Sequence, residues 1–191
     1  MKMIRVRTAT IEDAKALREI YKDYVENTVL TFEYEAPTLE EYQERMSHVL
    51  ERYPYLVAEC DGEILGFAYA STFRARPAYD WGVETTIYLN RKVRKQGVGR
   101  ALYTRLAEVL AAQGIVKVTA CITYPKDEFS NFGSMQFHER MGYRLAGRLE
   151  CSGYKLGRWY DTIYMDKFIG EPKEEMSAIL TFADVREQFE L

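Results

Sequence analysis

The chain has 191 residues, of which 47% are hydrophobic, and its 26 basic and 29 acidic side chains leave a net charge of −3 at pH 7. This composition suits one globular domain with a substantial core, and it argues against general attraction to nucleic acid or to an anionic membrane. No apolar run approaches bilayer-spanning length and the first residues lack the apolar centre of a signal peptide, so we expect a cytoplasmic protein with no nucleic-acid or membrane partner.

The N-terminal part reads as a strand followed by two helices. Residues 4–7 alternate like a strand, and Thr10 then provides an N-cap for a helix with apolar residues at helical spacing. A capping box begins at Thr38 and opens a second amphipathic helix that extends to Leu50. Both helices therefore present one apolar face to a core.

A β-hairpin and a fourth strand follow. The turn signal Asp-Gly at 61–62 stands between strand-like residues 55–59 and 64–71. The next strand covers 83–89, where alternate residues are apolar or threonine. Because side chains alternate across a strand, Glu84 is expected to point away from the apolar side.

A glycine-containing turn after this strand predicts an anion site. Residues 94–99 read Arg-Lys-Gln-Gly-Val-Gly and precede an amphipathic helix at 101–113, which ends before a capping glycine, Gly114. Two glycines let the backbone approach an anion, and the N–H groups that open the helix favour negative charge. We therefore expect a pyrophosphate seat here. Residues 116–122 alternate as a further strand, so the strand–helix–strand order predicts a right-handed parallel crossover.

The C-terminal part combines short elements with a charged tail. It is expected to hold a polar loop at 123–130, a short helix at 131–141, and a strand pair at 143–151 and 159–168. We assign residues 1–169 to one domain. Residues 170–191 form a tail of unassigned role with helical character towards its end.

The cysteine and histidine pattern predicts no metal. The three cysteines, Cys60, Cys121 and Cys151, form no closely spaced pair, and free buried thiols are the expected state. His48 and His138 stand far apart in sequence without a cluster at metal-ligand spacing.

The glycine turn resembles a known motif. Arg94, Gly97 and Gly99 match the acetyl-CoA signature Arg/Gln-x-x-Gly-x-Gly/Ala of the GNAT superfamily of N-acetyltransferases. The whole chain from residue 3 to about 168 is similar to the phosphinothricin acetyltransferase group of that superfamily. The segments that carry the likeness are 52–59, 76–81, 84–89, 97–103, 137–143 and 153–159. Several ordered segments at compatible spacing make a far more specific signal than the glycine motif alone.

The resemblance implies an α/β fold of the GNAT type and acetyl-CoA as cosubstrate. The implied sheet is twisted, mixed and mostly antiparallel, with a splayed central parallel strand pair flanked by helices. In this family the pantetheine arm bonds to the backbone at the end of the fourth strand, and the pyrophosphate meets the glycine turn. The implied cofactor-binding residues are Ile87, Tyr88, Leu89, Arg94, Lys95, Gln96, Gly97, Val98, Gly99, Arg100, Asn131 and Ser134.

Two residues are candidates for proton transfer. Glu84 occupies the position of the family's proposed catalytic glutamate, so the resemblance implies a general base, although the residues alone favour a solvated strand glutamate. His138 follows as the second candidate, because an imidazole with a pKa near 6.5 can protonate the leaving thiolate or act as an alternative base. A structural histidine beside an apolar stripe is the competing interpretation.

The acceptor site is inferred from four residues. Arg74 and Arg76 suit recognition of a carboxylate or phosphinate, and Tyr79 follows closely. In the phosphinothricin group the corresponding positions line the substrate site, as does the aromatic position of Phe32. The alternatives are a surface charge for Arg74 and a packed loop aromatic for Phe32.

The resemblance thus implies a homodimeric enzyme that acetylates the amine of a small amino-acid-like acceptor, such as phosphinothricin, methionine sulfoximine or methionine sulfone. Two departures leave the acceptor open: the loop 123–130 is longer than is usual in the group, and Tyr160 replaces its histidine. Alternatives are a polyamine, antibiotic or protein amine as acceptor, a non-catalytic acyl-CoA-binding module, or a generic nucleotide-binding domain. The second motif at 131–143 disfavours the last.

Overall fold

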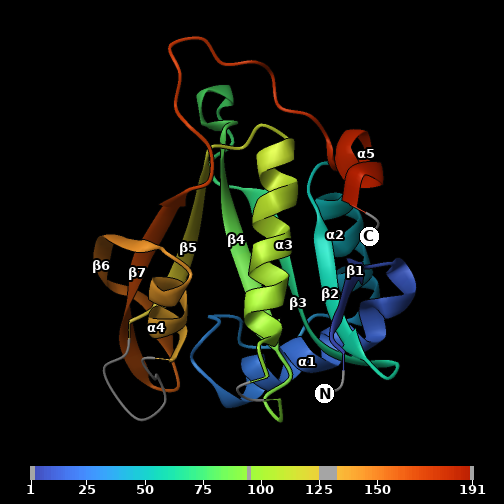
Figure 1. Cartoon of the computed structure of the whole chain (residues 1–191). Helices are drawn as coiled ribbons and strands as arrows, with labels where there is room; N and C mark the ends of the chain where they lie inside the picture. The colour runs from blue at the N-terminus through green and yellow to red at the C-terminus, as the bar shows by residue number, and fades with distance from the viewer. Residues whose placement is uncertain (1–2, 94–95, 125–132, 190–191) are drawn as a thin grey trace.

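The computed structural model describes residues 3–93, 96–124 and 133–189 (Figure 1). The strands are β1 (Arg5–Thr8), β2 (Tyr55–Cys60), β3 (Glu63–Thr72), β4 (Gly82–Leu89), β5 (Lys117–Thr123), β6 (Arg144–Lys155) and β7 (Arg158–Phe168). The helices are α1 (Ala14–Asn27), α2 (Leu39–Leu50), α3 (Val98–Ala112), α4 (Gly133–Arg140) and α5 (Phe182–Val185). Short 3-10 turns occur at Ile11–Asp13, Pro77–Tyr79 and Arg186–Phe189.

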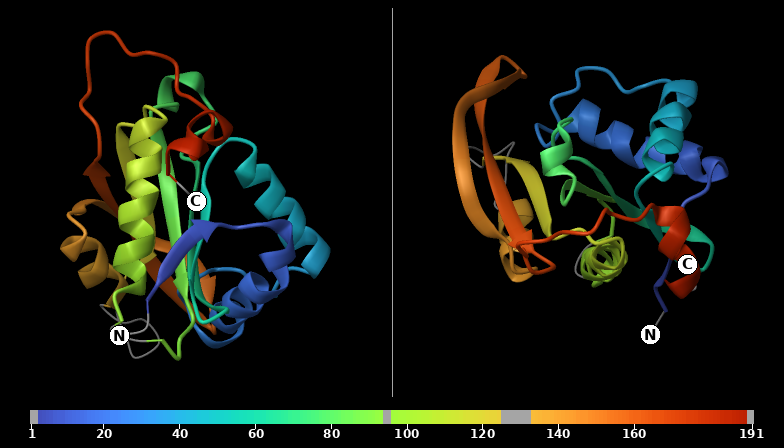
Figure 2. Two further views of the ribbon diagram at one scale, coloured as in Figure 1. Left: turned by 45° about the vertical axis from the view of Figure 1, so that its right-hand side comes forward. Right: turned by 90° about the horizontal axis from the view of Figure 1, so that it is seen from above.

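The strands form one seven-stranded sheet in the order β1-β2-β3-β4-β5-β7-β6. All neighbours are antiparallel except β4 and β5, which are parallel and joined through α3. The structure therefore confirms the predicted mixed, mostly antiparallel sheet with its central parallel pair. Seen from above, α1 and α2 cover one face of the sheet and α3 lies on the other (Figure 2).

Each face of the sheet has its own core. Strand alternation sends Val57 and Phe67 towards α1 and α2, whereas Leu56 and Ala68 pack on the α3 side. The capping box at Thr38 is present, with the Thr38 hydroxyl accepting a hydrogen bond from the Glu41 backbone N–H. The start of α2 follows from this local signal.

The turns follow the expected chemistry, but β6 differs from its prediction. Asp61 and Gly62 both have positive φ (52° and 80°), as a tight hairpin turn requires. β6 extends beyond 151 because a bulge centred on Cys151 (φ 48°) lets the strand continue to Lys155. The expectation of buried thiols is wrong for Cys121 and Cys151, which are exposed, and Cys60 is half-buried.

The tail returns across the sheet and packs on α3 (Figure 1). Phe182 and Val185 of α5 are buried against Val109. The backbone N–H of Leu180 donates to the Gln113 carbonyl at 2.8 Å. The tail is therefore held at the C-terminal end of α3.

Residues 3–93, 96–124 and 133–189 bear on two further features, a membrane-spanning helix and a metal site. No helix in these ranges is long and apolar enough to cross a membrane. In the same part of the chain, no group of three or more His, Cys, Asp or Glu side chains is arranged to hold a metal ion.

Candidate active site

Glu84 lies where the central parallel pair separates. The pairing of β4 with β5 covers Gly82 to Glu84, although β4 continues to Leu89. Because Val83 faces α3, the half-buried Glu84 side chain lies on the opposite face, towards α1 and α2. Desolvation raises the pKa of the Glu84 carboxyl, and the Arg74 guanidinium opposes this shift. A partly desolvated carboxyl of this kind suits a proton acceptor near neutral pH.

The backbone beyond Glu84 forms one side of the split. Thr85 marks its start, because the Thr85 hydroxyl donates to the Thr119 carbonyl at 3.3 Å across the diverging strands. Ile87, Tyr88 and Leu89 follow on β4, and the Leu89 carbonyl accepts a hydrogen bond from the Tyr24 hydroxyl at 2.8 Å. An extended ligand arm can bond to such an edge in the manner of an added strand.

The glycine turn opens α3 beside this split. Gly97 is the N-cap of α3 with φ 80°, a conformation that favours glycine. At Gly99 the reason for glycine is close packing, because a Cβ there would lie 3.0 Å from the Phe137 ring of α4. The first N–H groups of a helix have no intrahelical acceptor, so the start of α3 can bind an anion.

The remaining described cofactor candidates lie at the start of α3 and on α4. Gln96 and Arg100 are exposed at the start of α3, whereas Val98 is buried. Ser134 is half-buried on α4, and its carbonyl oxygen lies 2.8 Å from Nδ1 of His138. The candidates Arg94, Lys95 and Asn131 lie outside the described residues.

His138 is buried on α4 with both ring nitrogens in hydrogen bonds. Since the Ser134 carbonyl can only accept, Nδ1 carries the proton and Nε2 accepts from the Tyr103 hydroxyl at 3.1 Å. Burial lowers the pKa of His138, and the bond to Ser134 opposes this effect. The Tyr143 hydroxyl, which lies 3.1 Å from the Thr85 hydroxyl, links this aromatic cluster to the split.

The acceptor candidates come from two segments. Arg74 is exposed after β3 and stacks over Phe73, with its guanidinium carbon 5.1 Å from the ring centroid. Tyr79 contacts the same ring edge-on at 6.1 Å, and Arg76 is exposed at the N-cap of the 3-10 turn. Phe32 lies apart from this cluster, over Gly153 of β6. The structure therefore brings Arg74 near Glu84, whereas Phe32 packs on β6.

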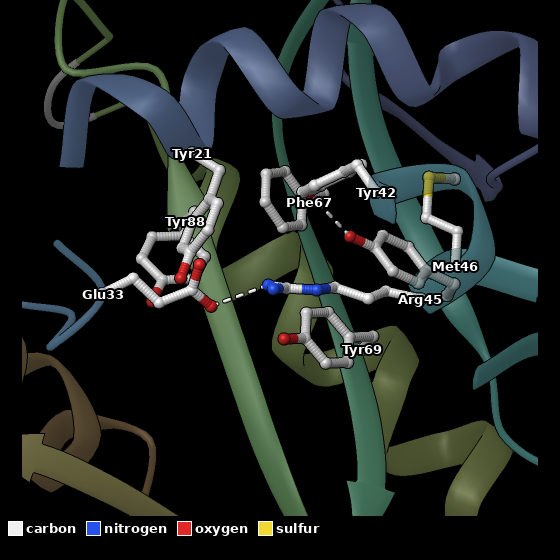
Figure 3. Close-up of a pocket in the computed structure, with 9 residues that line it drawn as sticks. Tyr21, Glu33, Tyr42, Arg45, Met46, Phe67, Tyr69 and Tyr88 are labelled. Atoms are coloured by element: carbon white, nitrogen blue, oxygen red, sulfur yellow. Dashed lines mark hydrogen bonds and ion pairs between the residues drawn. The ribbon is translucent and has the colours of Figure 1, made fainter. Parts of the chain in front are cut away.

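A pocket on the Glu84 face of the sheet was not predicted from the sequence (Figure 3). Tyrosines that read as ordinary core residues line it from both helices and three strands. Arg45 and Glu33 meet at its mouth, with a guanidinium–carboxylate distance of 2.6 Å. The available signal was the repeated tyrosine on one face of successive strands, at Tyr55, Tyr69 and Tyr88.

Comparisons with known proteins bear on the family of this chain. The family model described as "Acetyltransferase (GNAT) domain" matches residues 6–164. A phosphinothricin N-acetyltransferase from Streptomyces viridochromogenes is 39% identical over 158 residues, which cover 83% of this chain and 84% of the relative. An L-methionine sulfoximine/L-methionine sulfone acetyltransferase from Pseudomonas aeruginosa is 31% identical, with 84% of this chain and 91% of the relative covered.

A solved structure shows the same fold. The phosphinothricin acetyltransferase from Sinorhizobium meliloti, in complex with AcCoA, superposes with a TM-score of 0.82 at 33% identity. The match covers 94% of this chain and 98% of that one. The resemblance inferred from the motifs is confirmed, and the chain belongs to the GNAT family of acetyltransferases.

Proposed function

We propose that this enzyme transfers the acetyl group of acetyl-CoA to the α-amine of a small amino-acid-like acceptor. The single observation that carries the proposal is the position of Glu84. Its half-buried carboxyl lies at the point where β4 and β5 part, and the start of α3 follows the same strand. The proposed proton acceptor and the proposed anion site thus share one opening in the sheet.

The roles of the residues follow from this placement. Acetyl-CoA supplies the acetyl group, and the glycine turn with the β4 edge would hold its pyrophosphate and pantetheine. Glu84 removes a proton from the acceptor ammonium group, directly or through water, so that the amine can attack. Backbone N–H groups near Ile87 to Leu89 stabilise the charge that develops on the carbonyl oxygen.

His138 has a supporting role in the proposed reaction. Its ring fixes the Tyr103 hydroxyl, and this hydroxyl also lies 3.5 Å from the Thr85 carbonyl at the split. His138 is therefore proposed as a positioning residue that fixes the Tyr103 hydroxyl beside the split.

The relatives guide the choice of acceptor. Their names include phosphinothricin and methionine sulfoximine or sulfone, all amino acids with an α-carboxylate. Arg74 lies close enough to Glu84 to oppose its raised pKa, and a guanidinium there suits the acceptor carboxylate. The same positive charge disfavours a polyamine acceptor.

Thiol release from acetyl-CoA tests the function. The purified protein would be assayed with phosphinothricin, methionine sulfoximine, methionine sulfone, common amino acids, polyamines and aminoglycosides. We expect saturable turnover with at least one of the first three. Turnover confined to polyamines or aminoglycosides would contradict the acceptor class, and binding of acetyl-CoA without turnover would indicate a regulatory module.

The proposal includes a homodimer built on the β6–β7 hairpin. Five large apolar side chains there are about half exposed or more: Leu145, Leu149, Tyr154, Leu156 and Trp159. An apolar surface of this kind favours a second copy of the chain. Sedimentation velocity is expected to show a dimer that Trp159→Glu converts to monomer, whereas Met3→Glu, at an exposed apolar position outside this hairpin, leaves the dimer intact.

We also propose a cytoplasmic location. The three cysteines are free, which suits a reducing compartment, and acetyl-CoA is a cytoplasmic metabolite. Fractionation of cells that express the tagged protein tests this point, and recovery with the membrane or secreted fraction would contradict it.

A further inference from the structure

The tyrosine-lined pocket lies on the same sheet face as Glu84 and has no role in the mechanism above. It encloses about 70 Å³ between α1, α2 and the sheet. The ring of Tyr69 forms part of its wall (Figure 3). At about 10–15 Å³ for each water, this space holds about five waters or a short side chain of similar bulk.

The pocket adjoins the proposed catalytic carboxyl through Tyr69. On β3 and β4, Tyr69 pairs with Thr86 and Ser71 pairs with Glu84, so Tyr69 and Glu84 are diagonal neighbours on one face. Such neighbours lie within reach of long side chains. Burial raises the pKa of Tyr69, and the Glu84 charge contributes to the rise. An acceptor whose amine meets Glu84 can therefore extend its side chain into the pocket.

The interior of the pocket is polar but uncharged. The hydroxyls of Tyr42 and Tyr55 are 3.0 Å apart, and the Tyr21 hydroxyl lies 2.9 Å from that of Thr31. Burial raises the pKa of Tyr21, Tyr42 and Tyr55, so these hydroxyls stay protonated at neutral pH. Neutral hydroxyls can hydrogen-bond the oxygen of an uncharged polar group.

The mouth carries a closed ion pair. Arg45 of α2 donates to Glu33 of the loop between α1 and α2, at 2.6 Å, and Figure 3 shows the two side chains pointing towards each other. The side chains are 53% and 35% exposed, respectively. Because Glu33 neutralises Arg45, an anionic side chain that enters gains little from the guanidinium and approaches a carboxylate.

We infer that this pocket receives the side chain of the acceptor, and that the Glu33–Arg45 pair selects uncharged polar side chains, such as a sulfone, over anionic ones, such as a phosphinate. The inference rests on the proposed acetyltransferase function and names the group that determines its acceptor preference. Two like charges about 4 Å apart repel measurably even in a water-like environment. The discrimination therefore comes from Glu33, and Arg45 acts in the opposite direction.

Opposite substitutions in the pair test this inference. The ratio of kcat/KM for phosphinothricin to kcat/KM for methionine sulfone would be measured in the full-length protein. Glu33→Gln frees the guanidinium and is expected to raise this ratio about tenfold. Arg45→Gln leaves the carboxylate alone and is expected to lower the ratio several-fold. Glu35→Gln, the same change at an exposed position in the same loop, serves as the matched control and keeps the wild-type ratio.

The outcomes separate this inference from the proposed function. Thiol release with wild-type ratios in both variants would overturn the specificity assignment and leave the acetyltransferase function standing. A ratio that moves in the same direction in both variants would also overturn it, because only charge selection predicts opposite signs. Absence of thiol release with every amino-acid acceptor would overturn both.

Discussion

The protonation state of Glu84 depends on burial and on one neighbour, Arg74, which act in opposite directions. Partial burial disfavours the charged carboxylate and raises its pKa, whereas the Arg74 guanidinium favours the charged form. A general base works only when deprotonated, so the rate rises as the pH passes upward through this pKa. The acidic limb of the pH–rate profile is thus expected above the ordinary glutamate value of 4.5.

Glu84→Gln is expected to lower kcat by about 100-fold or more, because the variant cannot accept the ammonium proton. The acidic limb of its kcat/KM profile should disappear, while the dissociation constant of acetyl-CoA changes by less than about twofold. Steady-state kinetics across pH and calorimetric titration with acetyl-CoA measure both effects. Glu63→Gln, at an exposed position on β3, is the control. Loss of acetyl-CoA binding in Glu84→Gln would instead assign this residue a structural role.

His138 makes folding stability depend on pH. Burial lowers its pKa in the folded state below the ordinary histidine value of 6.5, so below about pH 6.5 the unfolded chain binds a proton that the folded chain excludes. Its contribution to stability is thus complete above this pH and declines on acidification, by up to about 1.4 kcal/mol per pH unit, until the folded pKa is reached.

Urea unfolding of the wild type and His138→Gln between pH 5 and pH 8 tests this linkage. The wild type should lose more stability than the variant between pH 6.5 and pH 5. Equal losses would show that His138 is protonated in the folded state. A fall in kcat of more than about 100-fold at unchanged stability would favour direct proton donation by His138 over positioning.

For single residues, the face of an element on which a side chain lies was easier to predict from the sequence than the partners that it contacts. Glu84 could be assigned to one face of its strand, because alternation is a local property. The pairing of Glu33 with Arg45 could not be predicted, since Glu33 lies in a loop that has no periodicity. Lys155 is a sharper case: its buried ammonium group donates to the Val25 carbonyl, 130 residues away in sequence. Only the assembled fold brings such partners together.

Among the elements, the loop between α1 and α2 is fixed to β6, the strand at one edge of the sheet. The Lys155 ammonium group donates to the Thr31 carbonyl at 2.8 Å, and the Tyr34 hydroxyl donates to the Tyr154 carbonyl at 2.6 Å. Between these two attachments, Phe32 lies directly over Gly153 of β6. The β6–β7 hairpin thus determines where Phe32 and the neighbouring Glu33 stand.

Gly153→Ala is expected to displace Phe32, because the new Cβ would lie 2.2 Å from a ring carbon. We expect KM for the acceptor to rise several-fold at constant KM for acetyl-CoA, with a loss of about 1–3 kcal/mol in the free energy of unfolding. Gly147→Ala on the same strand is a matched control, since a Cβ there has no heavy atom within 4 Å. Unchanged acceptor kinetics in Gly153→Ala would remove Phe32 from the acceptor site.

Elements with strong local signals were predicted well. The capping box of α2, the Asp-Gly hairpin and the glycine turn before α3 each depend on a few adjacent residues, and the structure contains all three. The length of β6 was underestimated, because its bulge is stabilised by a distant residue: the Asp161 carboxylate accepts from the Cys151 N–H at 3.0 Å and from the Arg148 guanidinium. Sequence spacing does not reveal such a partner.

In the molecule as a whole, the two ends of α3 serve different purposes. Its first turn opens at Gly97 beside the splayed strands, and its last turns carry the docked tail. Val98 and Val109 lie 11 residues apart in this helix, which corresponds to about 16 Å along its axis. The tail therefore packs too far from the glycine turn to contact a ligand there, and we propose that it stabilises the domain.

Phe182→Ala tests whether the two ends of α3 act independently. The substitution empties a buried site against Val109 and Val185, so the free energy of unfolding should fall by about 3 kcal/mol and amide exchange in 179–186 should accelerate. KM for acetyl-CoA should stay at its wild-type value, because the first turn of α3 remains anchored through Gly99 and Phe137. Leu180→Ala, at a position 46% exposed, is the control for loss of an apolar side chain in the same segment. A raised KM for acetyl-CoA in Phe182→Ala alone would mean that the tail acts on the cofactor site through α3, and that the helix transmits displacement from one end to the other.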